Sequence, residues 1–422
     1  MSTTAEKLQV IIDNKEAIKQ AIIDKGGQVG DFTTYAEAIA NLPSGGGDVN
    51  PTAKKNDVTF YDYDGTIRYS YTAEKFLALT EMPPLPTQQR LTCQGWNYDI
   101  ADAKTYVSKY GKLNIGATYI TYDGKTRLYI RIAAEGRMDV PLYFNQSVAN
   151  GVVIDWGDGS VTQTFAVTGK VNTTHTYASI GDYCITLTVA SGCTLSLGSG
   201  SSSYCVMGST GSAGRIYCHM LQKVELGNNI TSIGSYAFSS CYSLSSIVIP
   251  LNVTSFGASV LRSCPSLSSI VIPSNATYID ESMFHSCYTL SSVSIPSKVT
   301  SIKKSGFYNC SSLSSILIPS NVTSIGESAF TTDYSLSSVV IPPNVTSIAA
   351  SAFAYCYCML YYDFSYHTSV PTLSNTNAFS SIPSDCKIIV PDSLYSTWKT
   401  TTNWSSYKSQ IVKKSEWDSL KQ

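Results

Sequence analysis

The sequence predicts a multi-domain, mainly β protein whose C-terminal half is a solenoid of 23-residue repeats. The first observation is an Ile-Pro pair that recurs every 23 residues without a slip, beginning at Ile249, Ile272, Ile295, Ile318 and Ile341. Such a fixed period is the signature of a solenoid, in which each unit covers the next. The second observation is a series of alternating apolar and polar segments upstream of the repeats, separated by Asp-Gly turns, which is typical of β-strands. Because the chain has 422 residues, we expect several domains rather than one core.

Each repeat also places apolar side chains in the same register. A leucine column reads Leu221, Leu244, Leu267, Leu290, Leu313 and Leu336. An aromatic column reads Phe238, Leu261, Phe284, Phe307, Phe330 and Phe353. One repeat buries too few of these side chains to offset the entropy of ordering its backbone, so the copies must stack. We therefore expect five or six parallel strands with these columns facing inward.

The repeat unit matches a known frame. One copy reads Leu244-x-x-Ile247-x-Ile249-x-x-Asn252. This is the leucine-rich repeat frame L-x-x-L-x-L-x-x-N. With its Ala-Phe, cysteine and Ser-Leu-Ser-Ser-Ile positions, the unit resembles the BspA-like leucine-rich repeats of bacterial surface and adhesion proteins. The resemblance covers residues 221–365, and we expect the asparagines to form a stacked ladder in which Lys298 and His367 are replacements.

Residues 56–133 are expected to form a small α+β module. Its predicted elements are a hairpin of Val58–Tyr63 and Thr66–Tyr71, helices at Thr72–Ala78 and Asp99–Tyr110, and a second hairpin of Ala117–Tyr122 and Thr126–Ile132. Both hairpins are predicted from Asp-Gly pairs, which favour tight turns. The order of elements resembles a module of tail-associated proteins in phages that infect Gram-positive gut bacteria.

Residues 1–47 are expected to form an N-terminal helical assembly segment and linker. Its apolar face comprises Leu8, Ile11, Ile12, Ile18 and Ile22. This piece is too small to be stable alone, so its apolar face needs a partner. The phage module often follows such a segment. The resemblance therefore implies docking with other virion or tail proteins and, by analogy with fibres, a homo-oligomer, namely a trimer.

Two motifs in residues 138–190 resemble those of a polycystic-kidney-disease-type (PKD-type) β-sandwich. They are the turn Trp156-Gly157-Asp158-Gly159-Ser160 and the segment that begins His175-Thr176-Tyr177. The resemblance implies a spacer or adhesion module with Trp156 and Tyr183 inside. It also implies that Asp155 and Asp158 hydrogen-bond to the backbone of the turn, rather than bind calcium.

Two segments are expected to close the open ends of the solenoid. Residues 191–220 are rich in Gly and Ser and are the predicted N-terminal cap. Residues 366–422 are the predicted C-terminal cap, with a last strand at Lys387–Pro391. Its closing side chains are predicted to be Trp398, Trp404, Tyr407 and Ile411.

Composition argues against several classes of partner. Charged residues make up 14% of the chain and the formal net charge is −1, so we expect no nucleic-acid partner. No run of 18 apolar residues occurs, so we expect no membrane span. The polar start at residues 1–7 lacks an apolar core behind it, so export by the ordinary signal-peptide route is not expected.

One motif suggests catalysis. The segment from Asp62 to Thr66 spells D-x-D-G-T, the nucleophile loop of haloacid-dehalogenase-like phosphatases. That chemistry needs further residues on a doubly wound sheet, and no βαβ series follows here, so a hairpin turn is the favoured interpretation. The four histidines lie in separate segments, outside any nucleophile frame. We expect no enzyme, no catalytic or metal-binding residues and no cofactor.

Five of the twelve cysteines share one repeat position. They are Cys241, Cys264, Cys287, Cys310 and Cys356. Asp333 occupies the position in the remaining copy. A column of this kind indicates a buried ladder of small apolar side chains. We expect free thiols, because in-register side chains on parallel strands point alike and a disulfide needs a twisted geometry.

The predicted binding site is the outward face of the strands. Its two columns comprise Ser246, Ser269, Ser292, Ser315 and Ser338, and Val248, Val271, Ser294, Leu317 and Val340. At the spacing of β-strands they form an exposed stripe about 20 Å long. A further column, Tyr242, Tyr288, Tyr334 and Tyr357, follows the cysteines and is expected to flank this face or the opposite edge. The alternative is that the Val and Ile residues are present only because they favour strands.

Together these modules predict a non-enzymatic binding protein that contacts a host cell-surface protein or glycan. The first hypothesis is a phage tail or fibre-type protein, located in the virion. The second is a bacterial cell-surface adhesin, exported by another route. A third is a structural virion component without a receptor role.

Overall fold

The computed structural model describes residues 57–198, 204–209 and 215–419. The described residues belong to one compact unit, Asn56–Gln422. The predicted assembly segment at residues 1–47 lies outside the described residues.

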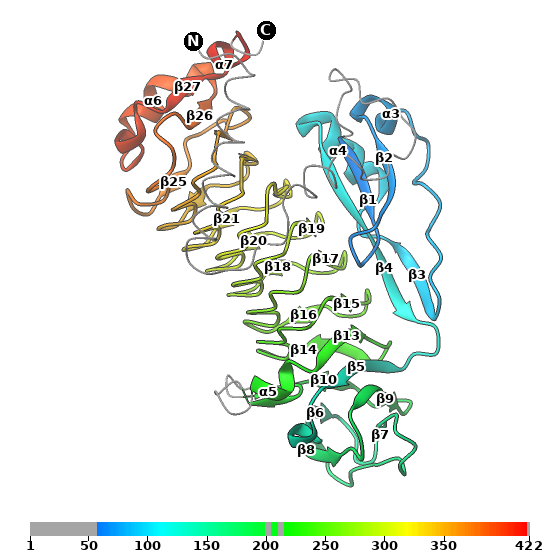
Figure 1. Cartoon of the computed structure of the whole chain (residues 1–422). Helices are drawn as coiled ribbons and strands as arrows, with labels where there is room; N and C mark the ends of the chain where they lie inside the picture. Colours follow the sequence, from blue (N-terminus) through cyan, green and yellow to red (C-terminus); the bar gives the residue numbers. More distant parts are fainter. Residues whose placement is uncertain (1–56, 199–203, 210–214, 420–422) are drawn as a thin grey trace, which may run out of the picture. The chain divides into compact units, whose positions relative to one another are not determined.

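The solenoid presents one row of parallel strands, visible in Figure 1. The row comprises β13 (Leu221–Glu225), β15 (Ser246–Val248), β17 (Ser269–Val271), β19 (Ser292–Ser294), β22 (Ser338–Val340), β24 (Tyr361–Asp363), β26 (Lys387–Val390) and β27 (Ile411–Lys413). The assigned pairs, such as β17 with β19 and β24 with β26, are parallel and stay in register. The predicted parallel strands are confirmed, except in the repeat at Ser315–Leu317, where the backbone is not assigned as a strand. The row is longer than predicted, because β26 and β27 extend it through the expected C-terminal cap.

A second row of short parallel strands forms another side of the coil. It comprises β14 (Ile230–Ile233), β16 (Ser255–Phe256), β18 (Tyr278–Ile279), β20 (Ser301–Ile302), β21 (Ser324–Ile325), β23 (Ser347–Ile348) and β25 (Thr372–Leu373). Most of these strands have two residues, with the Ile or Phe buried and the preceding residue facing outward. A segment this short carries no periodic pattern, so the sequence did not predict the second row.

The third side of the coil is built from turns that pair with the next repeat. Ser263 N donates to His285 O at 2.7 Å, and Phe284 N donates to Gly306 O at 2.9 Å. Each turn needs residues with positive φ, such as Ser259 at 59° and Ser263 at 58°. Residues other than glycine rarely adopt this conformation, and here inter-repeat hydrogen bonds hold it in place.

The predicted columns form the core of the solenoid. The leucine and aromatic columns are fully buried, and the rings of Phe307 and Phe330 stack at 5.4 Å between centroids. The predicted asparagine ladder is also confirmed: Asn275 Nδ2 donates to Leu251 O of the preceding repeat at 2.8 Å. Where His367 replaces asparagine, its ring nitrogen contacts Val345 O at 3.3 Å. The replacement therefore keeps a polar contact with the preceding turn.

Two facing sheets form a sandwich before the solenoid. They comprise β5 (Thr126–Ile132), β9 (Gly181–Val189) and β7 (Val152–Asp155) on one side, and β10 (Leu195–Leu197), β6 (Asp139–Gln146) and β8 (Gly169–Thr176) on the other. Both sheets continue into the solenoid, since β13 pairs with β5 and β14 pairs with β10. Trp156 is fully buried as predicted, whereas Tyr183 is half-buried at the edge of the core. The sandwich and the solenoid therefore share one hydrophobic core.

Residues 191–220 contribute β10 and several short elements near the first repeat. These are β11 (Tyr204–Cys205), β12 (Gly208–Ser209) and α5 (Arg215–Cys218). Cys205, Met207 and Cys218 are fully buried, and Val206 N donates to Ala237 O at 2.7 Å. The described part of residues 191–220 thus packs against the start of the solenoid.

Further upstream, a 3-10 turn, η1 (Glu135–Arg137), joins β5 to β6.

The α+β module has a four-stranded sheet in the order β2-β1-β4-β3. Its elements are β1 (Val58–Tyr61), β2 (Ile67–Tyr71), β3 (Leu91–Trp96), β4 (Leu113–Thr121), α3 (Ala73–Leu77) and α4 (Ile100–Tyr110). The first predicted hairpin and both helices are confirmed. Thr72 and Asp99 cap the helix N-termini through their side chains, and Gly111 ends α4 with a φ of 75°.

The second predicted hairpin is wrong. β4 pairs with β1 and β3, whereas β5 leaves the module and pairs with β9 and β13. Leu128, Ile130 and Ile132 of β5 are buried in the sandwich core. The turn at Asp123 and Gly124 is therefore a crossing point between two sheets, because burial of these side chains outweighs the local hairpin preference.

The C-terminal segment closes the far end. Its elements after β26 are η2 (Asp392–Leu394), α6 (Tyr395–Thr400), η3 (Trp404–Tyr407), β27 and α7 (Lys414–Ser419). Trp398 and Trp404 are fully buried, and Tyr407 and Ile411 are also in the core. Trp404 Nε1 donates to Pro371 O at 2.6 Å. The closing side chains are those the sequence predicted.

Candidate functional site

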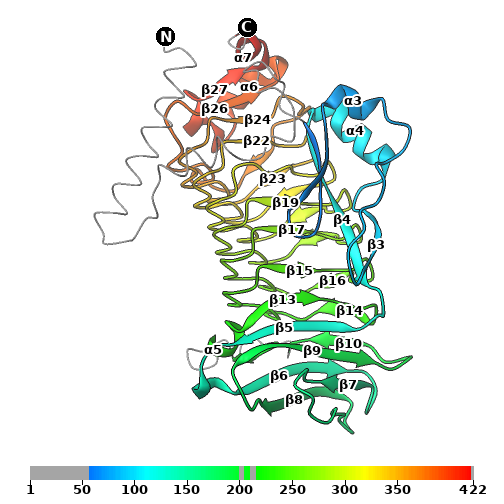
Figure 2. The ribbon, with the colours of Figure 1, turned by 45° about the vertical axis from the view of Figure 1, so that its right-hand side comes forward.

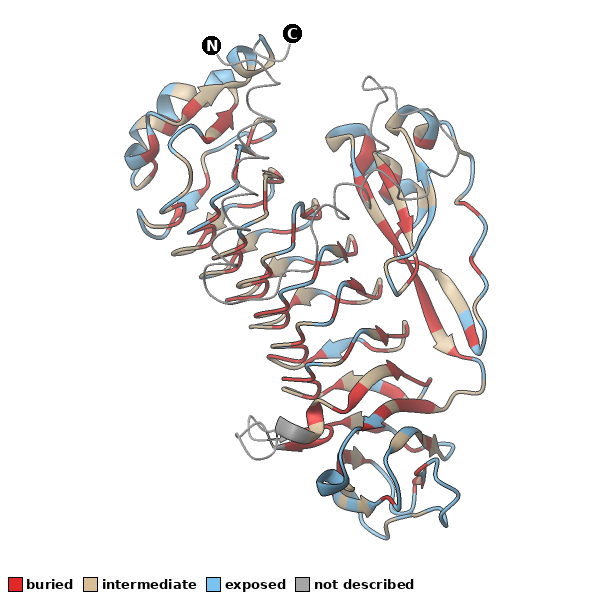
Figure 3. Cartoon of the chain, in the orientation of Figure 1, coloured by how far each residue is buried: buried red, intermediate tan, exposed pale blue. Residues whose placement is uncertain are grey.

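The strand face of the solenoid, meaning the outward surface of β15, β17, β19 and the neighbouring repeat at Ser315–Leu317, is covered by the α+β module. Figure 2 shows β4 passing beside these strands. Figure 3 shows that buried residues run along much of β4. The contact has an apolar part and a polar part, each formed by side chains of both partners.

Gly116 of β4 lies close to the solenoid. A Cβ atom at this position would lie 2.5 Å from Val271 Cγ1 and 2.6 Å from Val271 Cγ2. Val248 belongs to the same apolar cluster as Phe60, Trp96 and the rest of the module core, and Leu317 packs against it. Glycine is therefore required here by space, because any side chain would displace the valine.

Asn97 makes the central polar contact. Its Nδ2 donates to Ile272 O at 3.1 Å and to Ser294 Oγ at 2.9 Å, and its Oδ1 accepts from Gly116 N at 2.8 Å. Ser294 Oγ also donates to Asn114 O at 2.8 Å. Asn97 is 1% exposed and Ser294 is 2% exposed, so these bonds are shielded from water.

Two buried tyrosines extend this contact to the next repeats. Tyr98 OH donates to Ile295 O at 2.7 Å, and Tyr106 OH donates to Ile318 O at 2.9 Å. Burial raises the pKa of both hydroxyls, so each remains a proton donor at neutral pH. They satisfy the carbonyl group just after β19 and the equivalent carbonyl group of the next repeat.

The predicted exposed stripe is therefore wrong for four of its residues. Val248 is 1% exposed and Val271 is 6% exposed, and Ser269 and Ser294 are also buried. The others remain at least partly accessible: Ser246, Ser292, Leu317, Ser338 and Val340 are half-buried and Ser315 is exposed. The physical reason is that the outward valines and leucine pack against the module instead of facing solvent.

The tyrosine column remains at the surface. It comprises Tyr242, Tyr288, Tyr334 and Tyr357, which are 36%, 45%, 43% and 55% exposed. They lie in the turns that join the third side of the coil to the strand row, and the rings of Tyr334 and Tyr357 stack at 5.6 Å. Tyr355, 42% exposed, contacts Tyr357 edge-on. The column crosses five repeat intervals, which is about 24 Å at strand spacing.

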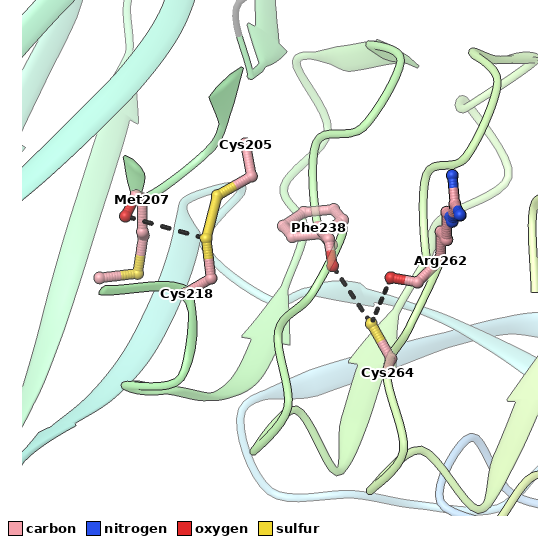
Figure 4. Close-up of a disulfide and its surroundings, with 6 residues drawn as sticks. All are labelled: Cys205, Met207, Cys218, Phe238, Arg262 and Cys264. Atoms are coloured by element: carbon pink, nitrogen blue, oxygen red, sulfur yellow. Dashed lines mark hydrogen bonds between the residues drawn. A yellow bond between two sulfur atoms is a disulfide. The ribbon is translucent and has the colours of Figure 1, made fainter. Parts of the chain in front are cut away.

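The cysteine column is buried and its thiols are unpaired. Cys264 Sγ donates to Phe238 O at 3.1 Å, a bond drawn in Figure 4, and Cys287 makes the equivalent bond to Leu261 O. Burial raises the pKa of Cys287 to about 12. The prediction of free thiols in this column is confirmed in the structure. A disulfide joins Cys205 to Cys218 beside the first repeat, and the sequence did not predict it.

The acidic motifs have structural partners. Asp155 Oδ1 and Asp158 Oδ1 accept from Gly157 N and Ser160 N, as predicted for the turn. Burial raises the pKa of Asp158, but hydrogen bonds from Ser160 and His175 outweigh it and lower the pKa to about 2. In the D-x-D-G-T segment, buried Asp62 accepts from Arg68 and Gln88, and Asp64 accepts from Thr66 N within the hairpin turn.

A pocket of about 210 Å³ lies at the contact between α4 and the solenoid; we call it the seam pocket. Its walls come from Tyr98, Asp102, Thr105 and Tyr106 on the module and from Ser297, Ser320 and Asn321 on the solenoid. Asp102 Oδ2 accepts from Ser297 Oγ at 2.8 Å, and Asn321 Nδ2 donates to Ser297 O at 2.8 Å. Sequence reasoning missed these residues, because no local pattern joins positions about 200 apart.

The repeats match a known family. Residues 216–310 and 254–384 fit the description "BspA type Leucine rich repeat region", in six copies. Residues 216–384 are a BspA-type leucine-rich repeat region. No curated protein sequence matches the chain. Among the described residues, every helix is too short or too polar to cross a membrane.

Solved structures similar to the BspA-type region come from several bacteria. A leucine-rich repeat protein of T. pallidum is 22% identical, with a TM-score of 0.31; the match covers 41% of this chain and 76% of that one. One from Bacteroides ovatus is 23% identical, with a TM-score of 0.34 and coverage of 40% and 50%. A leucine rich cell surface protein from Faecalibacterium prausnitzii is 20% identical, with a TM-score of 0.26 and coverage of 48% and 83%.

Proposed function

We propose that this chain is a non-enzymatic host-surface binding protein whose BspA-type solenoid is the recognition array. The observation that carries the proposal is the tyrosine column, which stays exposed although most of the solenoid's apolar positions are buried. Tyrosine is suited to recognition because it offers a large contact area, a hydroxyl group and little conformational entropy to lose. The sparse charge of the chain fits a neutral glycan or a polar protein loop as the ligand.

The first candidate setting is a phage tail or fibre. The order of modules supports it, since the α+β module resembles one in phage tail-associated proteins. The turn at Asp155–Ser160 keeps the hydrogen bonds expected of a PKD-type spacer domain. In this setting residues 1–47 dock with other virion proteins, and the chain forms a trimer that presents several solenoids to the host surface.

A bacterial cell-surface adhesin is the second candidate. The Cys205–Cys218 disulfide is consistent with it, because disulfides persist mainly in proteins that leave the reducing cytoplasm. A phage particle also meets the oxidising exterior after lysis, so the disulfide fits both settings. Either way, the proposal places the solenoid outside the cell that makes it.

The test is binding by the full-length chain to purified cell walls from a panel of Gram-positive gut bacteria. We expect saturable binding to walls of some strains and none to others. Antibodies against the repeats should then decorate tail tips of virions in the phage setting, or cell envelopes in the adhesin setting. Decoration of a capsid without wall binding would indicate a purely structural virion component and would contradict the proposal.

A further inference from the structure

We propose that the seam pocket between α4 and the solenoid binds a single neutral sugar ring. The choice of a sugar rests on the host-binding function proposed above, and the pocket adds a site separate from the tyrosine column. The tyrosines lie in the turns before the strands, whereas Ser297, Ser320 and Asn321 lie after them. The two sites therefore lie at opposite ends of the individual strands, with the tyrosines before the strands and the pocket after them.

The rigidity of the pocket comes from its aromatic walls. Tyr98 and Tyr106 are 5% and 4% exposed, and each hydroxyl is fixed by a bond to a carbonyl of the solenoid. Their rings are therefore held in place before any ligand arrives, which lowers the entropic cost of binding. Since both side chains are almost wholly buried, they form a fixed floor and leave recognition of a ligand to the polar groups around them.

The polar groups of the pocket can serve the hydroxyl rim of a sugar. The Asp102 carboxylate uses one oxygen to accept from Ser297, and its remaining lone pairs can accept from ligand hydroxyls. The Asn321 carboxamide donates one N–H to Ser297 O, leaving a second N–H and an acceptor oxygen. Thr105 and Ser320 add hydroxyl groups that both donate and accept.

Size and charge narrow the class of ligand. A volume of about 210 Å³ is below the range of roughly 300–1,000 Å³ typical of drug-sized ligands, so one ring is the fitting size. The lining contains one carboxylate and no cationic side chain, which disfavours phosphate and acidic sugars. Among the described residues no group of three His, Cys, Asp or Glu side chains could hold a metal ion, which disfavours a cation as the occupant.

The pocket exists because the module is docked. Four of its wall residues come from residues 98–106 and three from repeats about 200 positions later. Covering the strand face thus does two things at once: it buries the outward valines, and it creates a polar recess at the ends of the strands. The docked module therefore adds a ligand pocket beside the strand face, while the strand face itself stays buried.

The inference is tested with the full-length chain and four probes: the methyl glycosides of N-acetylglucosamine, galactose, glucose and rhamnose. Saturation-transfer NMR should detect at least one of them, with a Kd on the order of 1 mM, since a single small ring makes few contacts. Asp102→Ala should weaken that binding about tenfold or more, because a hydrogen bond to a charged group is lost. Asn321→Ala should weaken it by roughly two- to tenfold, because the Asn321 carboxamide is neutral and exposed.

Asn275→Ala is the matched control. Asn275 occupies the same repeat position two units earlier and donates to Leu251 O, and neither of these residues lines the pocket. We expect it to destabilise the solenoid as much as Asn321→Ala does, while leaving sugar binding unchanged. Equal weakening by both variants, or no binding of any probe, would overturn the inference. If the chain binds cell walls but none of the four glycosides, only the pocket inference fails. If the chain binds a glycoside but no cell wall, only the host-binding proposal fails.

Discussion

Asp333 is the one departure from the buried cysteine column. It is fully buried, and its Oδ1 accepts from Cys310 N at 2.7 Å, where a cysteine would instead donate its thiol to a carbonyl. Burial raises the pKa of Asp333 well above its ordinary value. A carboxyl group with a raised pKa in the folded state favours folding when it is protonated.

Replacing this residue should therefore change how stability depends on pH. For the unchanged chain, the contribution of Asp333 is fully present below its unfolded pKa of about 4 and is lost as pH rises towards the folded value. Asp333→Cys restores the column and should stabilise the chain at pH 8 by about 1–3 kcal/mol. Urea unfolding of the unchanged chain and of the Asp333→Cys variant at pH 5 and pH 8 measures this difference in the free energy of unfolding. If both chains lost the same stability between those two values, Asp333 would not be the group that titrates.

The thiols give a second prediction at this scale. Four of the five column cysteines, namely Cys264, Cys287, Cys310 and Cys356, donate their thiol to a carbonyl of the preceding repeat, so these thiols point alike. Mass spectrometry under non-reducing conditions should find Cys205 linked to Cys218 and the five column cysteines free. A Cys264–Cys287 cross-link in the native chain would contradict this.

Residue columns were predictable from the sequence because each repeat offers the same environment to the same position. The buried Leu, Phe and Cys residues, and the Asn ladder with its His367 replacement, follow directly from the period. The seam pocket was not predictable in this way. Its walls join residues far apart in the chain, and no repeat position distinguishes Asn321 from Asn344.

At the scale of elements, the covered strand face is the main departure from expectation. The outward valines Val248 and Val271 were interpreted as an exposed contact stripe, but they pack against β4. Hydrophobic periodicity indicates which side chains need burial, but it does not say what buries them. One local signal was present: Gly116 interrupts an apolar strand, which indicates close approach of another backbone or side chain.

Gly116→Val tests this contact. The new side chain would overlap Val271, so we expect a loss of about 1–3 kcal/mol in stability and faster hydrogen exchange in β4 and β17. Gly136→Ala is the control, because a Cβ there meets nothing within 4 Å. Unchanged exchange in the Gly116 variant would mean that the module does not rest on the strand face in solution.

At the scale of the whole molecule, the sandwich and the solenoid are continuous. β5 pairs with β9 and with β13, which lies about 90 residues further along the chain. The sequence predicted a sandwich and a solenoid but placed a boundary between them, because such distant strand pairing has no local signal. The same difficulty explains the misplaced second hairpin.

Assembly is also a property of the whole chain. Deleting residues 1–47 should leave a soluble protein with an unchanged melting temperature, since residues 56–422 form their own compact unit. The shortened chain should no longer incorporate into particles or form a trimer. Size-exclusion chromatography with light scattering measures the oligomeric state, and an unchanged oligomer would contradict the assembly role of residues 1–47.

The measurement that tests the central claim most directly compares wall binding by the full-length chain with that of a variant in which Tyr242, Tyr288, Tyr334 and Tyr357 are all changed to Ser. The matched control is Tyr122→Ser, a tyrosine that is 64% exposed outside the solenoid. The account predicts that the variant with four substitutions binds cell walls at least about tenfold more weakly, which corresponds to about 1.4 kcal/mol or more of binding free energy. Its melting temperature should change little. The control should bind as the unchanged chain does. Full wall binding by the variant with four substitutions would contradict the account.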